Sequence, residues 1–501
     1  MNQNNVIKIT NTANLPALNI KSQLTMNIDS NSPIKQVVNI EACLIESQAE
    51  SMNGKAVVKG VIGVKVIYVD YDNMFNTLSD TINFTETLSN DKLSNSCQIT
   101  ITNSQFITDF YNDDRSLKIN LEGNLECFCN LNSELNCFNN FNSNLVTKQI
   151  SLPAWSCVEK LDKSSSYNFG FKLDGKINKM LSCESKLTLD DSKCYDGYIV
   201  ISGQIINNIT CEIDGEPNYI KLYSNTTPFK CEVEASSCDT DCVADLSSYI
   251  NMNNTQISTE IEENYTKFDL EYSIVTSGYV YKNINLDVIQ DAYSLESAIE
   301  LVNTTYDICE RVPYLKTTEN VDLEVSLAEE INIDEILGMV NTSASVTQYV
   351  VNDNVVLIEG VINGNLLYLD ENRDIKHLST QLPYSISLKQ DIKNEVCAAR
   401  LNVVPTACKC KIKRGNTLMV DYEVCVSGTI YTKSSVSMIE DVKLGEEFNY
   451  NDIAFQIYLA RSGESSWELC KRLHITNEQL CEHNKETPTT YAGGEKIIVY
   501  R

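Results

Sequence analysis

The sequence predicts a mainly β fold, with three tandem β-sandwich-like repeat domains followed by a small strand–helix–helix–strand domain. Runs rich in Val, Ile, Thr and Tyr alternate between apolar and polar residues along most of the 501-residue chain. One ordered set of landmark residues recurs three times, and the last 48 residues follow a different pattern. Alternation with a period of two buries one face of a strand and leaves the other in water, which suits antiparallel sheets packed face to face.

The first landmark is a glycine between β-branched residues, as in VVKGVIGVKVIYVD, IVISGQIINNITCEID and VLIEGVINGNLLYLD. Eight residues later comes a tyrosine or cysteine, then an acid, and an aromatic residue stands 24 to 26 residues after the glycine. A second glycine recurs further along, and a proline precedes the first glycine by 44 to 50 residues. In that order the landmarks are Gly60, Gly203, Gly360; Tyr68, Cys211, Tyr368; Asp70, Asp214, Asp370; Phe84, Phe229, Tyr384; Gly123, Gly278, Gly428; and Pro16, Pro153, Pro313.

The landmarks divide the chain into β-rich repeats at 1–150, 151–312 and 313–450, with a proline opening each repeat. We interpret the repeated glycines as structural, because glycine inside a strand marks a bulge or a close approach of two backbones. Some helix is also expected inside the repeats, at DVIQDAYSLESAIELV (287–302) and at NIDEILGMV (332–340).

A change in charge marks the C-terminal domain at 454–501. Six basic and six acidic residues cancel there, so the whole net charge of −28 belongs to the first 453 residues. Ser465 is placed as the N-cap of a helix with the sequence SWELCKRL, and Thr476 with Gln479 forms a T-x-x-Q capping box for a second helix. Apolar residues then alternate in a closing strand that holds Ile497 and Val499.

This segment resembles a LysM domain. Gly463-Glu464-Ser465 stands where that family has Gly-Asp-Thr, Trp467 lies in the first helix, and Asn484 ends the second. LysM domains usually bind N-acetylglucosamine polymers in a shallow groove, so the resemblance implies a groove for glycan or partner. Its candidate residues here are Gly463, Glu464, Ser465, Ser466, Asn484, Lys485, Thr487 and Pro488.

Several groove positions depart from the LysM pattern. Glu464 replaces Asp, Ser466 and His483 replace apolar residues, and His474 replaces a glycine. We interpret Trp467 as a core residue and the two histidines as surface residues. The departures favour a protein partner over a glycan for this scaffold, and both alternatives stay open.

Composition excludes several classes of function. With 68 acidic against 40 basic residues, the chain is poorly suited to binding nucleic acid or anionic lipid. No apolar run approaches the roughly 20 residues that span a bilayer, and the N-terminus lacks the basic and apolar regions of a secretory signal. We therefore expect a soluble intracellular protein with no nucleic-acid partner and no membrane insertion.

Catalytic signals are also scarce. The chain has only three histidines, and no GxSxG, HExxH, P-loop or dinucleotide-binding pattern occurs in it. His377 lies outside the C-terminal domain in a polar stretch without a recognisable motif. The sequence therefore predicts no enzyme, no cofactor and no metal site.

Nineteen cysteines are scattered along the chain. Free and mostly buried thiols are the main interpretation, because thiols pack as small apolar side chains in a reducing compartment. A structural zinc site is a weaker alternative, since no CxxC pair repeats at ligand spacing; oxidative cross-linking in a later environment is another. The nearest spacings are Cys127/Cys129, Cys238/Cys242 and Cys408/Cys410.

Three acidic β-rich repeats followed by one LysM-like domain resemble the SipL-like spore coat morphogenetic proteins. The resemblance implies a chain made in the mother-cell cytoplasm that localises to the forespore surface. There it would bind the coat-basement ATPase SpoIVA and other coat proteins, with the LysM-like domain contributing to that contact, and would help to encase the forespore. Cys211 replaces the tyrosine of the other two repeats.

Three functions follow as hypotheses. The first is a non-enzymatic adaptor, whose repeats and terminal domain hold partners together. The second is a protein of the spore envelope that binds peptidoglycan or another N-acetylglucosamine polymer. The third is a self-assembling coat component, which threefold repetition and many thiols would suit.

Overall fold

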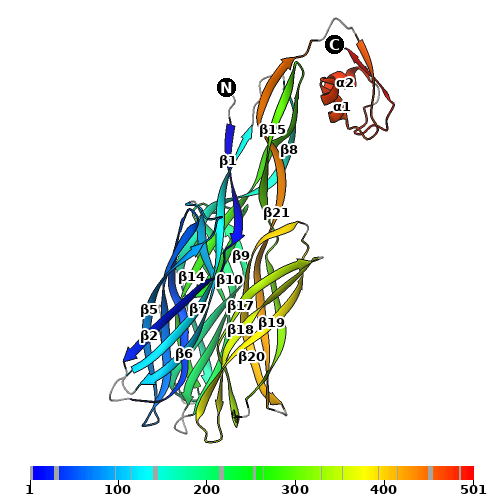
Figure 1. The fold of residues 1–501 in the computed structure, drawn as a ribbon. Coiled ribbons are helices and arrows are strands. Elements are labelled where there is room, and N and C mark those ends of the chain that lie inside the picture. The colour runs from blue at the N-terminus through cyan, green and yellow to red at the C-terminus, as the bar shows by residue number, and fades with distance from the viewer. Residues whose placement is uncertain are drawn as a thin grey trace.

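We describe a computed structural model of the chain, in which almost all described residues lie in antiparallel sheets. Three units of similar topology form an elongated body, and a small C-terminal module lies at the end of an arm (Figure 1). The described ranges are 4–27, 33–95, 97–113, 116–138, 145–213, 219–251, 256–262, 265–328, 330–352, 354–392, 394–413, 416–449, 455–484 and 487–500.

The first unit contains two sheets. Strands β3, β4 and β5 form a three-stranded meander, while β7 pairs with β1 and β2 in succession and also with β6. Because β2 and β6 pair with the same residues of β7, they lie on its two sides. The strands are β1 (Asn4–Asn14), β2 (Leu18–Asn27), β3 (Ile34–Met52), β4 (Lys55–Asp70), β5 (Phe75–Ser89), β6 (Gln98–Asp113) and β7 (Ser116–Phe138).

The second unit repeats this arrangement with one long first strand. Strands β9, β10 and β11 form its meander, and β14 pairs with β8, β12 and β13. Strand β8 by itself pairs along β14, whereas in the first unit β1 and β2 pair in succession along β7. The strands are β8 (Leu145–Asp174), β9 (Ile177–Tyr195), β10 (Tyr198–Ile213), β11 (Ile220–Glu234), β12 (Cys242–Ile250), β13 (Gln256–Ile261) and β14 (Tyr265–Ser294).

The third unit has the same plan. Its meander is β17, β18 and β19, and β21 pairs with β15, β16 and β20. Each of the three units has its own apolar core between its two sheets, so each is a sandwich. The strands are β15 (Ser297–Arg311), β16 (Leu315–Ser326), β17 (Glu335–Asn352), β18 (Val355–Leu369), β19 (Ile375–Lys389), β20 (Glu395–Lys413) and β21 (Thr417–Glu447).

Strand pairing places the unit boundaries earlier than the landmark prolines do. Strand β8 already pairs with β14 from Leu145, and β15 pairs with β21 from Ser297, whereas we expected boundaries at 151 and 313. The prolines lie within the first edge of each unit, between β1 and β2, inside β8, and between β15 and β16. An edge strand tolerates proline because one side of its backbone needs no sheet partner.

Both helices expected inside the repeats are wrong. Residues 287–302 form the end of β14, a turn and the start of β15, and residues 335–340 open β17. Each segment contains a β-bulge, one between Ile289 and Asp291 and another between Ile336 and Gly338. A bulge inserts one residue and shifts the alternation, so the apolar spacing resembles that of a helix.

The first landmark glycine makes room for the landmark aromatic in each unit. Gly60, Gly203 and Gly360 pair across the sheet with Phe84, Phe229 and Tyr384, respectively. A Cβ at Gly360 would lie 1.8 Å from the carbonyl oxygen of Ser345 and 2.7 Å from the ring of Tyr384, so no side chain fits. The predicted structural role of these glycines therefore has a direct steric cause.

The second landmark glycine serves backbone geometry in two units. Gly278 and Gly428 have φ values of +148° and +147°, which residues with side chains rarely adopt.

Among the landmark acids, Asp70 accepts a hydrogen bond from the backbone N–H of Met74 at 2.9 Å and fixes the turn after β4. Asp370 similarly holds the turn after β18, and Asp214 lies outside the described residues.

The three meanders meet in a shared apolar cluster that we call the axis core. In each meander a bulge follows the residue opposite the landmark tyrosine or cysteine, and the extra side chain points into this cluster. These three extra residues are Val38, Leu181 and Leu337. The units are thus packed around a pseudo-threefold axis by residues that stand at equivalent positions. The other members of the axis core are Ile67, Val69, Phe75, Ile220, Leu222, Val340, Leu367, Leu369 and Ile375.

The arm consists of the paired ends of β8 with β14 and of β15 with β21. These ladders continue to Ser294 and Glu447, and Figure 1 shows them rising above the body. Ile289, Ala292 and Ile439 pack the two ladders together. No helix of the described residues is long and apolar enough to cross a membrane.

Candidate functional site at the C-terminal module

The C-terminal module (Phe455–Tyr500) has the strand–helix–helix–strand order that the sequence predicts. It contains β22 (Phe455–Leu459), α1 (Ser466–Leu473), α2 (Asn477–His483) and β23 (Lys496–Tyr500), and the two strands pair antiparallel. Both helix caps predicted from the sequence are confirmed, because Ser465 and Thr476 each close a full capping box. Leu469, Cys470, Leu473, Leu480, Ile497 and Val499 form most of the buried core.

Glu464, a predicted groove residue, is instead part of the framework of the module. Its side chain is buried, and its two carboxylate oxygens accept hydrogen bonds from Arg472 at 2.7 and 2.9 Å. The same carboxylate accepts a bond from the backbone N–H of Arg461. These bonds, first of all those from Arg472, hold the pKa of Glu464 below its usual range. A buried and fully paired carboxylate is poorly placed to contact a ligand.

The two stretches predicted to line the groove are brought together and partly closed by hydrogen bonds. The hydroxyl of Ser466 donates to the carbonyl of Pro488 at 2.5 Å, and the N–H of Gly463 donates to the carbonyl of Tyr491. Ser465 is occupied as the cap of α1 and forms an isolated bridge with Thr490. Of these residues, Gly463, Pro488 and Thr490 stay exposed.

The remaining groove candidates also include one residue that holds the module together and one that is partly exposed. Asn484 ties α2 to β23: its amide donates to the carbonyls of Leu480 and Ile498, and its carbonyl accepts from the N–H of Ile498. Thr487 is partly exposed, and Lys485 lies outside the described residues. The sequence pattern therefore identified framework positions of the domain more than free ligand contacts.

The module is attached to the arm through α1. The carboxylate of Asp291 on β14 accepts a hydrogen bond from the indole N–H of Trp467 at 2.7 Å and also pairs with Lys471. The ring of Trp467 meets that of Tyr293 edge-on, and the hydroxyl of Tyr293 donates to the carbonyl of Ile475 at 2.7 Å. Trp467 is thus partly a core residue, as predicted, and partly a contact to the arm.

The two histidines of the module differ in their surroundings. His474, which ends α1 in a left-handed conformation, contacts the carbonyl of Ser294 at 3.1 Å and packs on the ring of Phe448. It therefore belongs to the attachment to the arm rather than to a free surface. His483 is exposed and lies beside the ring of Tyr500, in line with the surface position predicted for it.

The module carries an apolar surface that sequence reasoning missed. One face of the β22–β23 sheet exposes four large side chains, with 53% of Phe455, 58% of Ile457, 58% of Leu459 and 49% of Tyr500 accessible. We call these four residues the outer face. Side chains alternate between the two faces of the strand FQIYL. Because Tyr458 packs on the core of the module, Ile457 and Leu459 lie on the opposite face, and the sequence could have indicated this.

The outer face also points away from the rest of the molecule. Figure 1 shows α1 on the side of the arm and β22 on the side away from it. Contiguous exposed apolar side chains on a soluble protein commonly mark a site of protein–protein contact. The outer face is therefore the strongest candidate for partner binding in this module.

The cysteines lie mostly in apolar surroundings. Ten of the described thiols are buried, and loss of hydration raises the pKa of Cys127 to about 12, which makes it unreactive. Sulfur atoms lie close in several pairs, among them Cys309 with Cys397 at 3.4 Å and Cys408 with Cys410 at 3.7 Å. Within the described ranges, no group of three or more His, Cys, Asp or Glu side chains could hold a metal ion.

Comparison with known protein families gives a match in the first unit. A family model described as SipL, SPOCS domain, matches residues 33–101. This segment comprises the meander β3–β5 and the start of β6, and it contains the landmarks Gly60, Tyr68 and Phe84. No curated protein matches the chain. The family match supports the resemblance to SipL-like spore coat proteins that the sequence indicated.

Proposed function

Because residues 33–101 match the SPOCS domain of SipL and make this a SipL-like, spore-associated chain, we propose that it is a non-enzymatic spore coat morphogenetic adaptor. It binds a SpoIVA-like coat ATPase, and with it other coat proteins, in the mother-cell cytoplasm at the forespore surface. There it helps the coat to encase the forespore. The single observation that carries this proposal is the exposed outer face on a module held at the far end of the arm.

The geometry suits an adaptor that links two contacts. The body offers one large surface, and the module offers a second that is kept away from it by the arm. Two weak contacts joined by a fixed spacer gain affinity, because the second binding event becomes intramolecular. The outer face includes Phe455 and Tyr500, and aromatic side chains are enriched at protein interfaces.

Recovery of the coat ATPase with the tagged chain from sporulating cells tests this proposal. We expect the double substitution Ile457→Ser and Leu459→Ser, and deletion of 455–501, to lower recovery at least tenfold. The matched control is Thr489→Ala with Thr490→Ala, which changes two exposed side chains directly after the groove candidate Pro488 and should leave recovery unchanged. Undiminished recovery with the truncated chain would contradict the proposal.

The same variants separate the adaptor from a glycan-binding protein. Binding of a glycan in the predicted groove requires that purified peptidoglycan sediments the native chain and fails to sediment the Thr489→Ala and Thr490→Ala variant. We expect no sedimentation with either chain. Loss of sedimentation in the groove variant alone would replace the adaptor with a wall-binding function.

A further inference from the structure

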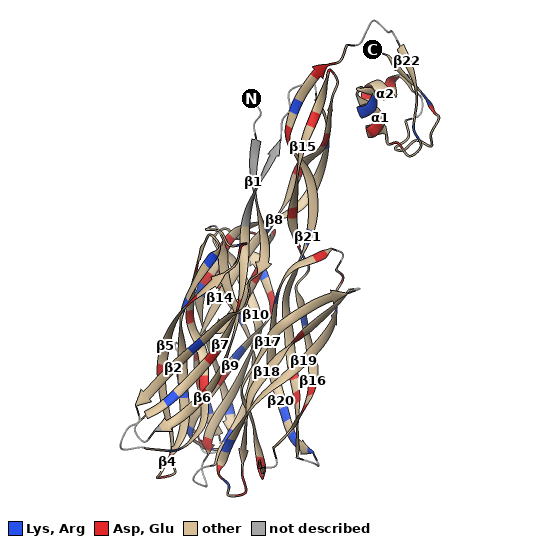
Figure 2. Cartoon of the chain, viewed as in Figure 1, with Lys and Arg blue, Asp and Glu red and all other residues tan. Residues whose placement is uncertain are grey.

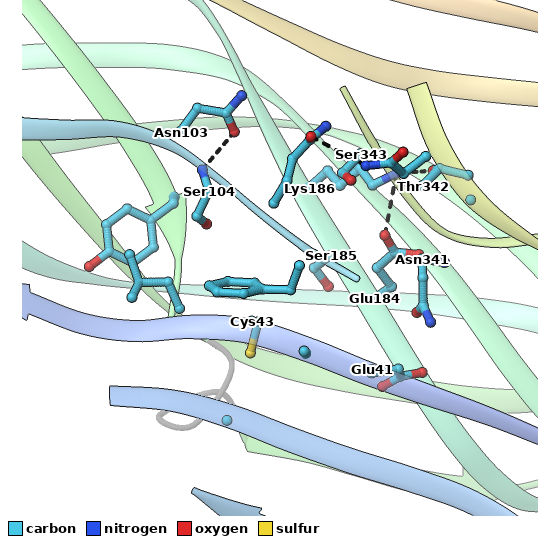
Figure 3. A pocket seen from close by; sticks show the side chains of 18 of the residues that line it. Glu41, Cys43, Asn103, Ser104, Glu184, Ser185, Lys186, Asn341, Thr342 and Ser343 are labelled. Carbon is cyan, nitrogen blue, oxygen red and sulfur yellow. Dashed lines mark hydrogen bonds and ion pairs between the residues drawn. The ribbon is translucent and has the colours of Figure 1, made fainter. Parts of the chain in front are cut away.

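A large cavity lies in the body where the three units meet, away from the C-terminal module. Its volume is about 1130 Å³, and it is lined by residues of all three units. Figure 3 shows side chains from different units converging on it, including Glu41 and Cys43 of the first unit, Lys186 of the second and Ser343 of the third. This volume exceeds the roughly 300 to 1,000 Å³ of typical small-molecule sites.

Strands at the edges of sheets supply much of the cavity wall. Runs of consecutive residues line it, and the longest is 101–108 in β6. Successive side chains of a strand point to opposite sides, so a run of consecutive residues borders the cavity with backbone as well as with side chains. Shorter runs of this kind come from β3, β9, β17 and β20 at 40–44, 183–187, 341–344 and 402–405.

Each of these five strands pairs with a single neighbour in the described parts of the chain. Their second edges therefore carry backbone N–H and C=O groups that no described strand pairs with in a sheet. Side chains of neighbouring units satisfy a few of these groups: the amide of Asn103 donates to the carbonyl of Ala344 at 2.9 Å, and Glu184 accepts from the N–H of Asn341 at 3.1 Å. An unpaired edge of this kind is a template for an added strand.

The side chains of the cavity favour an uncharged ligand with apolar groups. Ile107 and Tyr249 line it with 41% and 37% of their surfaces accessible. Cys43 is exposed as well and lines the cavity, and loss of hydration with the nearby charge of Glu41 raises the pKa of its thiol to about 11.

Charge in the cavity is nearly balanced, although the chain as a whole carries −28. Three acidic and two basic residues line it, namely Glu41, Asp80, Glu184, Lys65 and Lys186. Lys186 is already paired with Glu184 at 3.3 Å. A strongly charged ligand would therefore find no unbalanced counter-charge there, whereas a neutral segment would meet both hydrogen-bonding groups and apolar side chains.

We propose that this cavity binds an extended peptide segment of another protein, which pairs with the free edge of β6 at 101–108. The segment alternates aliphatic with small uncharged side chains, because one of its faces meets Ile107 and Tyr249 and the other meets the polar wall. Main-chain hydrogen bonds to the edge supply affinity, and the pockets for alternate side chains supply selectivity. The proposal does not depend on binding of the coat ATPase by the C-terminal module.

Selection from a random library of displayed 12-residue peptides on the full chain tests the proposal. Ser343→Trp fills the cavity, and Ser387→Trp on β19 is the matched control, because Ser387 is exposed and does not line the cavity. We expect alternating, uncharged peptides that bind the native chain and the control equally and bind Ser343→Trp at least tenfold more weakly. Equal binding to all three chains, or no enriched peptide, would overturn the proposal.

Alkylation of Cys43 gives a second measurement that does not depend on how the tryptophan variant folds. Mass spectrometry follows labelling of Cys43 in the cavity and of Cys481, which is exposed on the module. A peptide bound along β6 slows labelling of Cys43 at least fivefold and leaves Cys481 unchanged. Protection of Cys43 by a small amphiphile such as a fatty acid, but by no peptide, would also overturn the proposal.

Discussion

Asp245 and Arg400 form an ion pair that is almost completely buried between the second and third units. Their closest atoms are 3.4 Å apart, and the side chains are 2% and 4% exposed. Arg400 also donates to the backbone carbonyl of Asp245 and to the hydroxyl of Ser247, while Tyr431 donates to the Asp245 carboxylate. Nearly every polar atom of the pair is thus satisfied inside the protein.

Replacing Arg400 by alanine is expected to destabilise the body strongly. The substitution leaves the Asp245 charge buried without its partner, which typically costs about 3–5 kcal/mol. Denaturant unfolding of the native and variant chains measures this loss. The control is Lys21→Ala, which breaks the exposed pair with Glu122 and should cost at most about 1 kcal/mol. Equal effects of the two substitutions would show that burial of the pair does not matter.

Glu126 of β7 gives the body a dependence on pH. Loss of hydration raises the pKa of its carboxyl to about 7, although hydrogen bonds from Val346 and Asn103 act in the opposite direction. An unfolded glutamate ionises near pH 4.3. Between these two values the folded chain keeps a proton that the unfolded chain has released, so the free energy of unfolding falls as pH rises.

We therefore expect Glu126→Gln to increase the free energy of unfolding more at pH 8 than at pH 4. The difference between the two effects should be at most about 3 kcal/mol. Glutamine keeps a carbonyl that accepts from the N–H of Val346, so the link between the first and third units is retained. Urea unfolding at pH 4, 6 and 8 provides the measurement. Glu122→Gln, an exposed change on the same strand, should show no such trend, and an identical trend in both variants would refute the assignment.

At the level of elements, the sequence predicted β-rich repeats but assigned helix to two segments that contain bulges. In β17 and just before it, the apolar residues Ile333, Ile336, Leu337 and Val340 have helical spacing, because the bulge after Ile336 turns Leu337 toward the axis core. A bulge is set by pairing with another strand, and a single segment read alone cannot show it. The helix caps of the module were predictable because a capping box depends only on residues within one turn.

The candidate site shows the same division between local and long-range information. Ser465 and Thr476 were identified correctly from local sequence. Glu464 is paired with Arg472, which is 8 residues further along the chain. The hydrogen bond between Trp467 and Asp291 joins residues that are 176 positions apart. Such contacts leave no periodic signal, so the central cavity and the attachment of the module appeared only in the structure.

Asp291 is expected to control how firmly the module is held on the arm. Asp291→Ala removes the acceptor of the Trp467 indole and of Lys471 while leaving the module's own core intact. The chain has two tryptophans, so a Trp155→Phe background isolates the emission of Trp467. We expect a shift of this emission to longer wavelength in Asp291→Ala, because the indole becomes hydrated.

Asp287→Ala is the matched control for that measurement, since Asp287 is an exposed acid on the same strand. It should leave the Trp467 emission unchanged. If Asp291→Ala also leaves it unchanged, the side chain of Asp291 does not hold the module in place. The attachment would then rest on the contacts of Tyr293 with Ile475 and of His474 with Ser294.

On the scale of the whole molecule, the three units pack against one another and are not independent domains joined by linkers. The axis core takes residues from all three meanders, and the arm packs β14 against β21. Lys and Arg as well as Asp and Glu occur along many strands of the body (Figure 2). Burial of apolar area between units is non-directional and cooperative, so the body should unfold as one.

Two neighbouring leucines on β18 test this cooperativity. Leu366 is buried in the core of the third unit, whereas Leu367 is buried in the axis core. Each change to alanine should cost about 2–5 kcal/mol. Because the units are coupled through the axis, we expect both variants to keep a single calorimetric transition of the body at a lower temperature. If the units were independent, Leu366→Ala would produce a separate early transition for the third unit, and Leu367→Ala would leave the unfolding of each unit unchanged.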